Sequence, residues 1–595
     1  IITMPKYTPP IKDFLFLLFE LFQIKKVNPE IFSEYGEDVV EPILTEAGKL
    51  AAEMIFPSNA LGDMEGCRLE AGNVFTPSGF KQAFKYICDG EWPTLNCDPE
   101  YGGQGIPLTI ATPVGEFFGS ANVALYIYHV LSHGVYSTIK EHGTEDQRNV
   151  FLPKLVKSKW TGTMNLTEPQ CGTDLGLIKT KALPAGNSTY KISGQKIYIS
   201  AGDHDLSENI IHLVLARIPG SPDGVKGISL FIVPKFLIGA NGQIKSKNNV
   251  SVGKIESKMG IHGNATCVMD YDEATGYLLG FENKGLASMF TMMNEARLAV
   301  GIQGLSQAEI SYQHATQYAK DRVQGVPISK KNSTNTREET IIAHPDVRRM
   351  LMEQKSFIEG ARAFSIWCSL LIDRGNYLND TNSIGLVSLL IPVFKAFLSD
   401  KGFESTISAQ QVMGGHGYIE ESGMSQFVRD SRIAMIYEGT NGVQAIDLVG
   451  RKLLASGGVY VVQFINEIKS FMKESSTDAI LQEEFITPLK SALSDLESSL
   501  SDFMERGSAD PERVLSGATD FLHLFGHVVL GYMWSKMAEV SLEKIGKSDK
   551  DDTFYQSKLI TGKFYMKRSL PETKVRLARV ISGKSVVMDL NKELF

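Results

Sequence analysis

Glu438 is the carboxylate whose neighbours best fit a general base. It stands at the centre of residues 436–440, which read Ile-Tyr-Glu-Gly-Thr. The glycine behind it lets the backbone turn sharply, so the side chain is set to reach an apolar pocket. Burial there raises the pKa of a carboxylate and makes it a competent base near neutral pH. The segment alone also fits a surface glutamate in a turn between helices, so the decision rests on the rest of the chain.

The hydrophobic pattern changes along the chain and divides it into the regions that would have to position this carboxylate. Apolar residues recur at helical spacing near the N-terminus, short β-branched runs separated by Gly, Pro, Asn and Asp follow, and the helical period then returns. The predicted fold class is α+β multidomain. Its parts are a helical N-terminal domain (1–160), a middle β-domain that faces the flavin (161–283), a four-helix bundle that carries Glu438 (284–454) and an additional helical C-terminal domain (455–595).

Several local patterns refine this division. In the N-terminal domain, Val135, Ile139 and His142 follow a helical repeat, whereas residues 191–200 carry β-branched residues around an expected Ser-Gly turn. Residues 325–340 are polar and fit either an insertion that acts as a lid or an exposed loop. In the C-terminal domain we expect an apolar helix at 519–540. The start of this helix would have Asp510 as N-cap and Pro511 as first residue.

The N-terminal apolar stretch, residues 14–19, predicts a buried helix and not a membrane span. It is too short to cross a bilayer, and Glu20 interrupts it. Asp13 is the expected N-cap. The apolar surface of the C-terminal helix likewise predicts packing on other parts of the protein, without membrane insertion.

Composition narrows the class of protein. A net charge of -8 and a pI near 5.9 argue against a nucleic-acid partner. The six cysteines are scattered, with no C-x-x-C pair and no histidines at zinc spacing, so we expect neither disulfides nor a metal site. His416 and His262 lie in glycine-rich turns and are expected to pack there. We expect a cytoplasmic location.

Over about residues 40–453 the chain resembles the acyl-CoA dehydrogenase family of flavoproteins. The order of the domains is similar, and four segments carry the resemblance in order and spacing. These segments are Met164-Asn165-Leu166-Thr167-Glu168-Pro169-Gln170-Cys171-Gly172-Thr173-Asp174, Lys196-Ile197-Tyr198-Ile199-Ser200-Ala201-Gly202, Gln411-Val412-Met413-Gly414-Gly415-His416-Gly417-Tyr418 and the segment around Glu438.

The resemblance implies FAD as cofactor and names its contacts in the β-domain. Met164, Leu166, Thr167 and Ser200 would meet the flavin through backbone and hydroxyl groups, since flavin reactivity depends on hydrogen bonds around its ring. Tyr198 stands where the family usually has tryptophan over the dimethylbenzene edge of the flavin.

Five further residues would contact FAD from the helical bundle. Arg322 resembles the arginine that reaches the pyrophosphate of the neighbouring subunit, and Gln411 and Gly415 resemble residues that meet the same cofactor across the dimer. A homodimer or a dimer of dimers is implied. Gln324 is a further candidate, although the family's phenylalanine is missing before the polar segment. Thr440 would contact FAD directly after the base.

The same resemblance implies the mechanism. Glu438 would take the α-proton of an acyl-CoA while a hydride passes to flavin N5, which gives a trans-2-enoyl-CoA, and an electron-transferring flavoprotein would accept the electrons. Gly439 would let Glu438 also offer its amide to the thioester, while Arg297 would lie beneath the site and Thr173 near the CoA. Some members carry the base at the position of Ala296, and Glu295 is turned by about 100° from there.

The additional domain resembles that of the long members of the family, among them dehydrogenases of 3-methylmercaptopropionyl-CoA. This leaves the substrate open between 3-methylmercaptopropionyl-CoA and a fatty acyl-CoA, as in β-oxidation. Two alternatives within the fold are an acyl-CoA oxidase and a redox-inactive flavoprotein like the alkylation-response relatives that bind DNA. The nearly neutral charge of residues 461–595 and the intact Glu438 segment speak against the latter.

Overall fold

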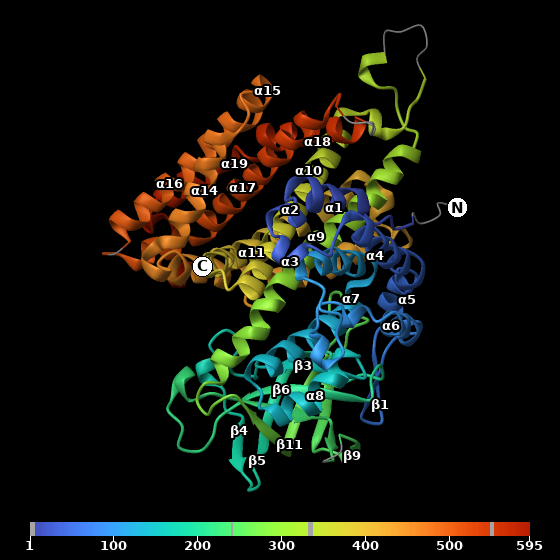
Figure 1. The fold of residues 1–595 in the computed structure, drawn as a ribbon, viewed down its shortest axis with the longest axis vertical. Helices are drawn as coiled ribbons and strands as arrows, with labels where there is room; N and C mark the ends of the chain where they lie inside the picture. The colour runs from blue at the N-terminus through green and yellow to red at the C-terminus, as the bar shows by residue number, and fades with distance from the viewer. Residues whose placement is uncertain (1–5, 240–241, 331–336, 508, 548–551) are drawn as a thin grey trace. The chain divides into compact units, whose positions relative to one another are not determined.

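The computed structural model describes residues 6–239, 242–330, 337–507, 509–547 and 552–595 (Figure 1). The chain divides into two compact units. One, here the helical unit, contains residues 1–48, 107–116 and 300–595. The other, the sheet unit, contains residues 49–106 and 117–299. Helices α4, α7 and α9 each continue from one unit into the other.

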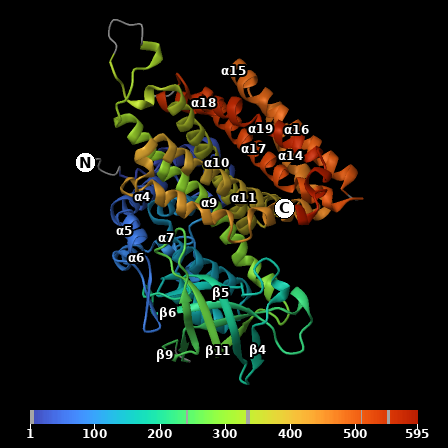
Figure 2. The same ribbon diagram turned by 180° about the vertical axis from the view of Figure 1, so that it is seen from behind.

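A seven-stranded mixed sheet is the centre of the sheet unit (Figure 2). Its strands follow the order β3-β6-β7-β11-β5-β4, with β10 paired to β11. The pair β3–β6 is parallel and the other pairs are antiparallel. The bounds of these strands are β3 Trp160–Asn165, β4 Lys181–Pro184, β5 Thr189–Ser200, β6 Asn209–Ala216, β7 Ser229–Pro234, β10 Val250–Ile255 and β11 Thr266–Leu279.

Strands β6 and β7 are buried along their whole length, because both of their faces are covered. Two short antiparallel pairs and four helical segments complete the sheet unit. They are β1 Arg68–Glu70 with β2 Asn73–Phe75, β8 Phe236–Ile238 with β9 Ile244–Lys247, α5 Pro57–Glu65, α6 Phe80–Asp89, most of α7 Leu108–His142, and α8 Glu145–Val156.

The helical unit is built from long helices that lie side by side (Figures 1 and 2). Its helices are α1 Ile11–Leu15, α2 Ile24–Val27, α3 Pro29–Phe32, α4 Glu37–Leu50, most of α9 Gly285–Asp321, α10 Pro345–Leu378, α11 Thr381–Val412, α12 Met424–Arg432, α13 Asn441–Asp447, α14 Val459–Glu474, α15 Ala479–Leu481, α16 Thr487–Arg506, α17 Pro511–Lys544, α18 Thr553–Phe564, α19 Glu572–Ile581 and α20 Ser585–Met588. With the sheet unit, these elements confirm the predicted fold class, including the additional helical region at the C-terminus.

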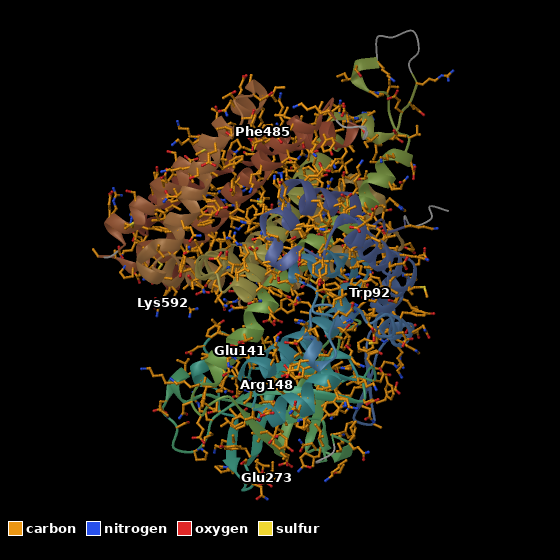
Figure 3. All side chains as sticks on the ribbon, viewed as in Figure 1. Trp92, Glu141, Arg148, Glu273, Phe485 and Lys592 are labelled. Atoms are coloured by element: carbon orange, nitrogen blue, oxygen red, sulfur yellow. The ribbon has the colours of Figure 1, made fainter. Side chains whose placement is uncertain are left out.

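Helix α17 is the core of that additional region. The apolar residues expected to be covered are buried, each at most 2% exposed: Phe521, Leu522, Leu524, Phe525, Val528, Val529, Tyr532 and Met533. The indole of Trp534 donates to the carbonyl of Ser356 on α10 at 3.0 Å. Phe485, labelled in Figure 3, is 1% exposed, and a Cβ on Gly562 would come within 2.9 Å of its ring. The additional region therefore packs closely on itself and on α10.

Within the described part of the chain, two helices are long and apolar enough to cross a membrane by length and composition, α11 and α17. In each, 72% of the most apolar window is buried inside the protein, as in core helices of soluble proteins. Near the N-terminus, Phe14 to Leu18 are largely buried in a short helix that continues as a π-helical segment, Phe16–Leu21, which agrees with the predicted buried helix.

Two local predictions were wrong. Asp13 is not an N-cap. It lies inside α1, buried between Arg362 and Lys558, partners that no local pattern reveals. Strand β5 runs straight through the Ser-Gly pair, where we expected a turn, because its neighbour β11 absorbs the irregularity by register shifts.

Asp510 occupies the N-cap position of α17, and Pro511 is the first residue as predicted, but the carboxylate of Asp510 makes no capping hydrogen bond. It accepts instead from Lys584 at 3.0 Å, because a charged partner is within reach. The β1–β2 hairpin within the predicted helical N-terminal domain was also missed.

Candidate active site

Glu438 lies in a tight turn of the helical unit. The turn joins the 3-10 segment Ile433–Met435 to helix α13. Glu438 has φ +59° and Gly439 has φ +80°, so two consecutive residues are left-handed. For glycine this conformation is cheap, but for a residue with a side chain it costs on the order of 1–3 kcal/mol. The surrounding contacts must hold Glu438 in this strained conformation.

Buried side chains provide those contacts. Lys395 of α11, which is fully buried, donates from Nζ to the carbonyl of Gly439 at 2.8 Å. Gln444 donates from Nε2 to the carbonyls of Glu438 at 3.1 Å and of Gly439 at 3.2 Å. Thr440 accepts from the amide of Val443 at 3.2 Å and so caps α13. The sequence did not predict that Lys395 and Gln444 support this turn, because neither residue belongs to the motif around Glu438.

Tyr437, just before Glu438, is anchored to α9. Its hydroxyl donates to Oε1 of Gln303, and burial together with the carboxylate of Glu438 raises the pKa of the phenol. Glu438 itself is half-buried within the helical unit. The turn therefore presents a carboxylate on a backbone that is fixed on both sides.

A second group of predicted residues lies in the sheet unit, at the ends of β3 and β5. Met164 belongs to β3, and Leu166 and Thr167 follow it. The amide of Ile197 donates to the carbonyl of Thr167 at 2.9 Å, which joins this loop to β5 beside Tyr198. This contact brings the loop of Leu166 and Thr167, which follows Met164, beside the end of β5 that carries Tyr198 and Ser200.

Tyr198 is held in an unusual conformation. Its φ is +58°, its side chain is 63% exposed, and the register between β5 and β11 shifts around it. Such β-bulges re-aim side chains and are frequent beside active sites. Backbone strain that exposes an aromatic ring fits a surface that stacks a planar ligand.

A buried ion pair fixes the loop that carries Leu166 and Thr167. Lys196 is fully buried, and its Nζ lies 2.8 Å from Oε1 of Glu168 and 2.9 Å from the carbonyl oxygen of Leu166. Burial alone would raise the pKa of Glu168, but the ammonium of Lys196 and hydrogen bonds from Thr180 and Lys179 lower it to about 2. Both residues stand inside the quoted motifs, yet their pairing was missed from the sequence.

Thr173 is exposed on the loop that follows β3, whereas Arg297 is buried within α9 at 4% exposure. Ala296 is buried beside it, and its neighbour Glu295 points to another partner: Oε2 lies 3.0 Å from Nδ1 of His133. Burial would lower the pKa of His133, but the carboxylate of Glu295 and the thiol of Cys97 raise it well above its ordinary value. Glu295 is therefore engaged in an ion pair inside the sheet unit.

A third group lies at one end of the helical unit. Arg322 follows the last residue of α9, and the ring of Tyr318, one turn earlier, stacks on His416 with centroids 5.4 Å apart. This contact brings the segment Gly414–Tyr418 against the end of α9. Gln411 is exposed on the last turn of α11, and Cβ atoms at Gly414 and Gly415 would meet nothing within 4 Å. An exposed guanidinium and open glycines fit a phosphate-bearing ligand.

Gln324 immediately precedes the polar segment 325–340, whose residues 331–336 lie outside the described residues. Its amide donates to the carbonyl of Glu339 at 2.9 Å, and Val323 forms an antiparallel bridge with Thr340. His344 donates from Nε2 to the carbonyl of Gln324 at 2.7 Å. The ends of the segment are thus paired to one another, while the alternatives of lid and exposed loop stay open.

Among the described residues no group of three or more His, Cys, Asp or Glu side chains could hold a metal ion. His262 contacts Asp63 at 2.9 Å and the carbonyl of Lys258 at 2.8 Å, and His416 stacks on Tyr318, so both histidines pack in their turns as expected. The predicted site residues therefore form two groups in the helical unit and one in the sheet unit.

Profiles of protein families match four successive parts of the chain. Residues 68–159 match the N-terminal domain of acyl-CoA dehydrogenases, residues 163–274 the middle domain and residues 283–454 the C-terminal domain. Residues 464–591 match a domain described as acetyl-CoA dehydrogenase C-terminal like.

Whole-chain comparisons agree with these profiles. The chain is 38% identical over 579 residues to 3-methylmercaptopropionyl-CoA dehydrogenase of Ruegeria pomeroyi, which covers 96% of this chain and 98% of the relative. It is 32% identical over 610 residues to butyryl-CoA dehydrogenase of Syntrophomonas wolfei, with 99% of each chain covered. The crystal structure of acyl-CoA dehydrogenase complexed with FAD from Bacillus anthracis matches with a TM-score of 0.72 at 19% identity, over 98% of this chain and 93% of that chain.

Proposed function

Because the chain belongs to the acyl-CoA dehydrogenase family, we propose that Glu438 is the base that removes the α-proton of an acyl-CoA substrate. Members of the family are oxidoreductases that act on CH–CH groups, with FAD as cofactor. The observation that carries the proposal is the left-handed conformation of Glu438, held by Lys395 and Gln444. Strain of this kind persists where the surrounding structure enforces it, which is typical of active sites.

The proposed mechanism uses Glu438 twice. Its carboxylate takes the proton from the α-carbon, and its amide N–H donates to the thioester oxygen as that oxygen gains negative charge. Gly439 permits the turn that allows both roles. Bound FAD supplies the acceptor for the hydride that leaves the β-carbon, and the product is a trans-2-enoyl-CoA. Lys395 and Gln444 keep the carboxylate in place throughout.

The residues predicted to hold FAD fit such a group chemically. Tyr198 offers an exposed aromatic face, and Leu166 and Thr167 lie on a loop that the Lys196–Glu168 pair makes rigid. We propose Arg322 for the pyrophosphate, because a guanidinium forms bidentate hydrogen bonds with phosphate oxygens. The other proposed contacts of FAD are Gln411, Gly415, Thr440 and Gln324. The residues proposed to contact or support the acyl-CoA are Thr173, Gly439 and Arg297.

We propose an acyl-CoA thioester as substrate, either 3-methylmercaptopropionyl-CoA or a fatty acyl-CoA. The relatives from Ruegeria pomeroyi and Syntrophomonas wolfei carry the names of a 3-methylmercaptopropionyl-CoA and a butyryl-CoA dehydrogenase. An electron-transferring flavoprotein is the proposed acceptor of the electrons. The proposed oligomeric state is a homodimer or a dimer of dimers, and the proposed location is the cytoplasm. A panel of acyl-CoAs tested for anaerobic bleaching of the flavin would rank the substrates.

Replacing Glu438 by glutamine tests the proposal. A glutamine keeps the shape of the side chain but cannot accept the α-proton, so bleaching by the best acyl-CoA should slow by about 10²–10⁴-fold. The matched control is Glu295→Gln, because Glu295 is the other carboxylate considered as base. This control should bleach at the wild-type rate. If Glu295→Gln slows the bleaching of the flavin and Glu438→Gln does not, the base is Glu295 and not Glu438.

A further inference from the structure

A chain of hydrogen bonds connects the additional C-terminal region to the turn that carries Glu438. Nε2 of His523, on α17, lies 2.8 Å from Oδ2 of Asp400 on α11. The other oxygen of the same carboxylate, Oδ1, accepts from Nδ2 of Asn441 at 2.7 Å. Oδ1 of Asn441 accepts from Nζ of Lys395 at 2.8 Å, and Lys395 also donates to the carbonyl of Gly439. All of these residues belong to the helical unit.

The donors and acceptors along this chain are complementary at every link. Because a carboxylate only accepts, His523 must donate to Asp400 and Asn441 must turn its NH₂ toward it. That orientation leaves the amide oxygen of Asn441 facing the ammonium of Lys395. The imidazole is 5% exposed and the lysine 0%, so water competes little at either end. Each link therefore fixes the orientation of the next.

We propose that His523 is a positioning residue for the dehydrogenation, through which the additional region holds the turn at Glu438. The inference rests on the proposed role of Glu438. His523 orients Asp400, Asp400 orients Asn441, and Asn441 keeps Lys395 against the carbonyl of Gly439. Without this chain the carbonyl of Gly439 loses a fixed donor, which is one of the side-chain restraints on the left-handed residues of the turn. The additional region thus has a role in catalysis beyond covering α10 and α11.

His527 offers a matched control one helical turn further along α17. It is 2% exposed, and both imidazoles pack edge-on against the ring of Phe397, with centroids 5.0 Å away for His527 and 5.7 Å for His523. Nδ1 of His527 bonds the hydroxyl of Tyr565 at 3.0 Å, and its Nε2 lies 3.1 Å from Oε2 of Glu572, so neither of these polar contacts is with Asp400. Phenylalanine at either position keeps the aromatic packing and removes the polar contact.

The experiment compares three variants of the FAD-loaded enzyme. His523→Phe should slow the bleaching of the flavin at saturating acyl-CoA by about tenfold, because small displacements of a catalytic group cost one to two orders of magnitude in rate. His527→Phe should leave the rate unchanged even where it lowers the thermal midpoint. His523→Gln, whose amide can donate to Asp400, should recover most of the rate. Should His523→Phe fail to fold, Asp400→Asn tests the same link and should also slow bleaching.

Hydrogen exchange gives a readout that does not depend on turnover. Backbone amides of residues 436–444 should exchange faster in His523→Phe than in wild type. In His527→Phe their exchange rate should equal that of wild type. Equal rates of bleaching and exchange in the two phenylalanine variants would overturn the proposal. If Glu438→Gln stays active while exchange rises in His523→Phe alone, the assignment of the base fails and the link between the additional region and the turn stands.

Discussion

Two fully buried lysines, Lys196 in the sheet unit and Lys395 in the helical unit, each support a segment that carries predicted site residues. Each donates to a backbone carbonyl of that segment, Lys196 to Leu166 at 2.9 Å and Lys395 to Gly439 at 2.8 Å. Each also lies near a strained aromatic or acidic residue with a φ close to +60°, Tyr198 or Glu438. They differ in the side chain that each ammonium meets besides that carbonyl.

The two lysines differ in where these contacts lead: Lys196 contacts a residue of the loop that it supports, whereas the contact of Lys395 with Asn441 leads on toward helix α17. Lys196 pairs with the carboxylate of Glu168, which lies in the same loop that the lysine supports. Lys395 meets the neutral amide of Asn441, and Asn441 in turn bonds the carboxylate of Asp400, which is shared with His523. The sheet unit thus fixes its loop by itself, whereas the turn at Glu438 depends on the additional C-terminal region.

Glu168→Gln should produce the largest loss of stability. Removing one partner of a buried ion pair leaves the other charge uncompensated, which costs about 3–5 kcal/mol. Urea denaturation at pH 7 measures the change. The matched control is Glu70→Gln, which breaks an exposed pair between Arg68 and Glu70, 3.1 Å apart, and should cost at most about 1 kcal/mol. Equal losses in the two variants would show that the Lys196–Glu168 pair contributes no more than a surface contact.

The cost of Glu168→Gln should also depend on pH. With a pKa of about 2 in the folded protein against an ordinary value of 4.5, the carboxylate stabilises the fold above pH 4.5, by about 3 kcal/mol. This contribution is lost as the pH falls from 4.5 toward 2. The difference in stability between wild type and variant should therefore narrow between pH 5 and pH 3. A difference that stays constant over this range would contradict the lowered pKa.

Lys395→Met should reduce catalysis more than stability. The variant keeps the length of the side chain but releases the carbonyl of Gly439, so we expect bleaching of the flavin to slow by about 10²-fold. Lys401→Met is the control, because Lys401 lies on the same helix and pairs with Glu404 at 3.0 Å and Glu572 at 3.4 Å, away from the turn. If the flavin bleaches as fast in Lys395→Met as in Lys401→Met, Lys395 does not support catalysis.

Tyr198→Gly should have the smallest effect on the free energy of unfolding, and this effect should be a gain in stability where Glu168→Gln gives a loss. Glycine adopts a positive φ without strain, so the free energy of unfolding of the apoprotein should rise by about 1 kcal/mol. Binding of FAD, measured by flavin fluorescence, should weaken, since the aromatic contact is lost. Tyr198→Phe keeps the ring and should match wild type in both measurements. Unchanged affinity in the glycine variant would exclude Tyr198 as a flavin contact.

The sequence predicted the parts of this molecule that local pattern controls. Helical spacing placed the helix around Val135, and β-branched runs placed β6, β7 and the first half of β11. The sharp turn at Glu438 followed from the glycine behind it, whereas the left-handed φ of Glu438 itself was not predicted. These features depend on residues within a few positions of one another, so a single sequence carries them.

What the sequence could not predict depends on residues that are distant along the chain. Asp13 looked like an N-cap, but it meets Lys558, 545 positions away. Lys395 and His523 show no motif of their own, and their roles arise only because α11 packs against both α13 and α17. Lys196 lay inside a quoted motif, yet its partner Glu168 is 28 positions away, beyond the reach of local spacing.

The central claim, that Glu438 removes the α-proton, is tested most directly by exchange of that proton with solvent. The measurement uses an acyl-CoA analogue with sulfur in place of the β-carbon, which binds without giving up a hydride, and follows deuterium entering the α-carbon in D2O. Wild type and Glu295→Gln should exchange at the same rate, and Glu438→Gln at least about 10²-fold more slowly. Exchange by Glu438→Gln within about tenfold of wild type would contradict the assignment of Glu438 as the base.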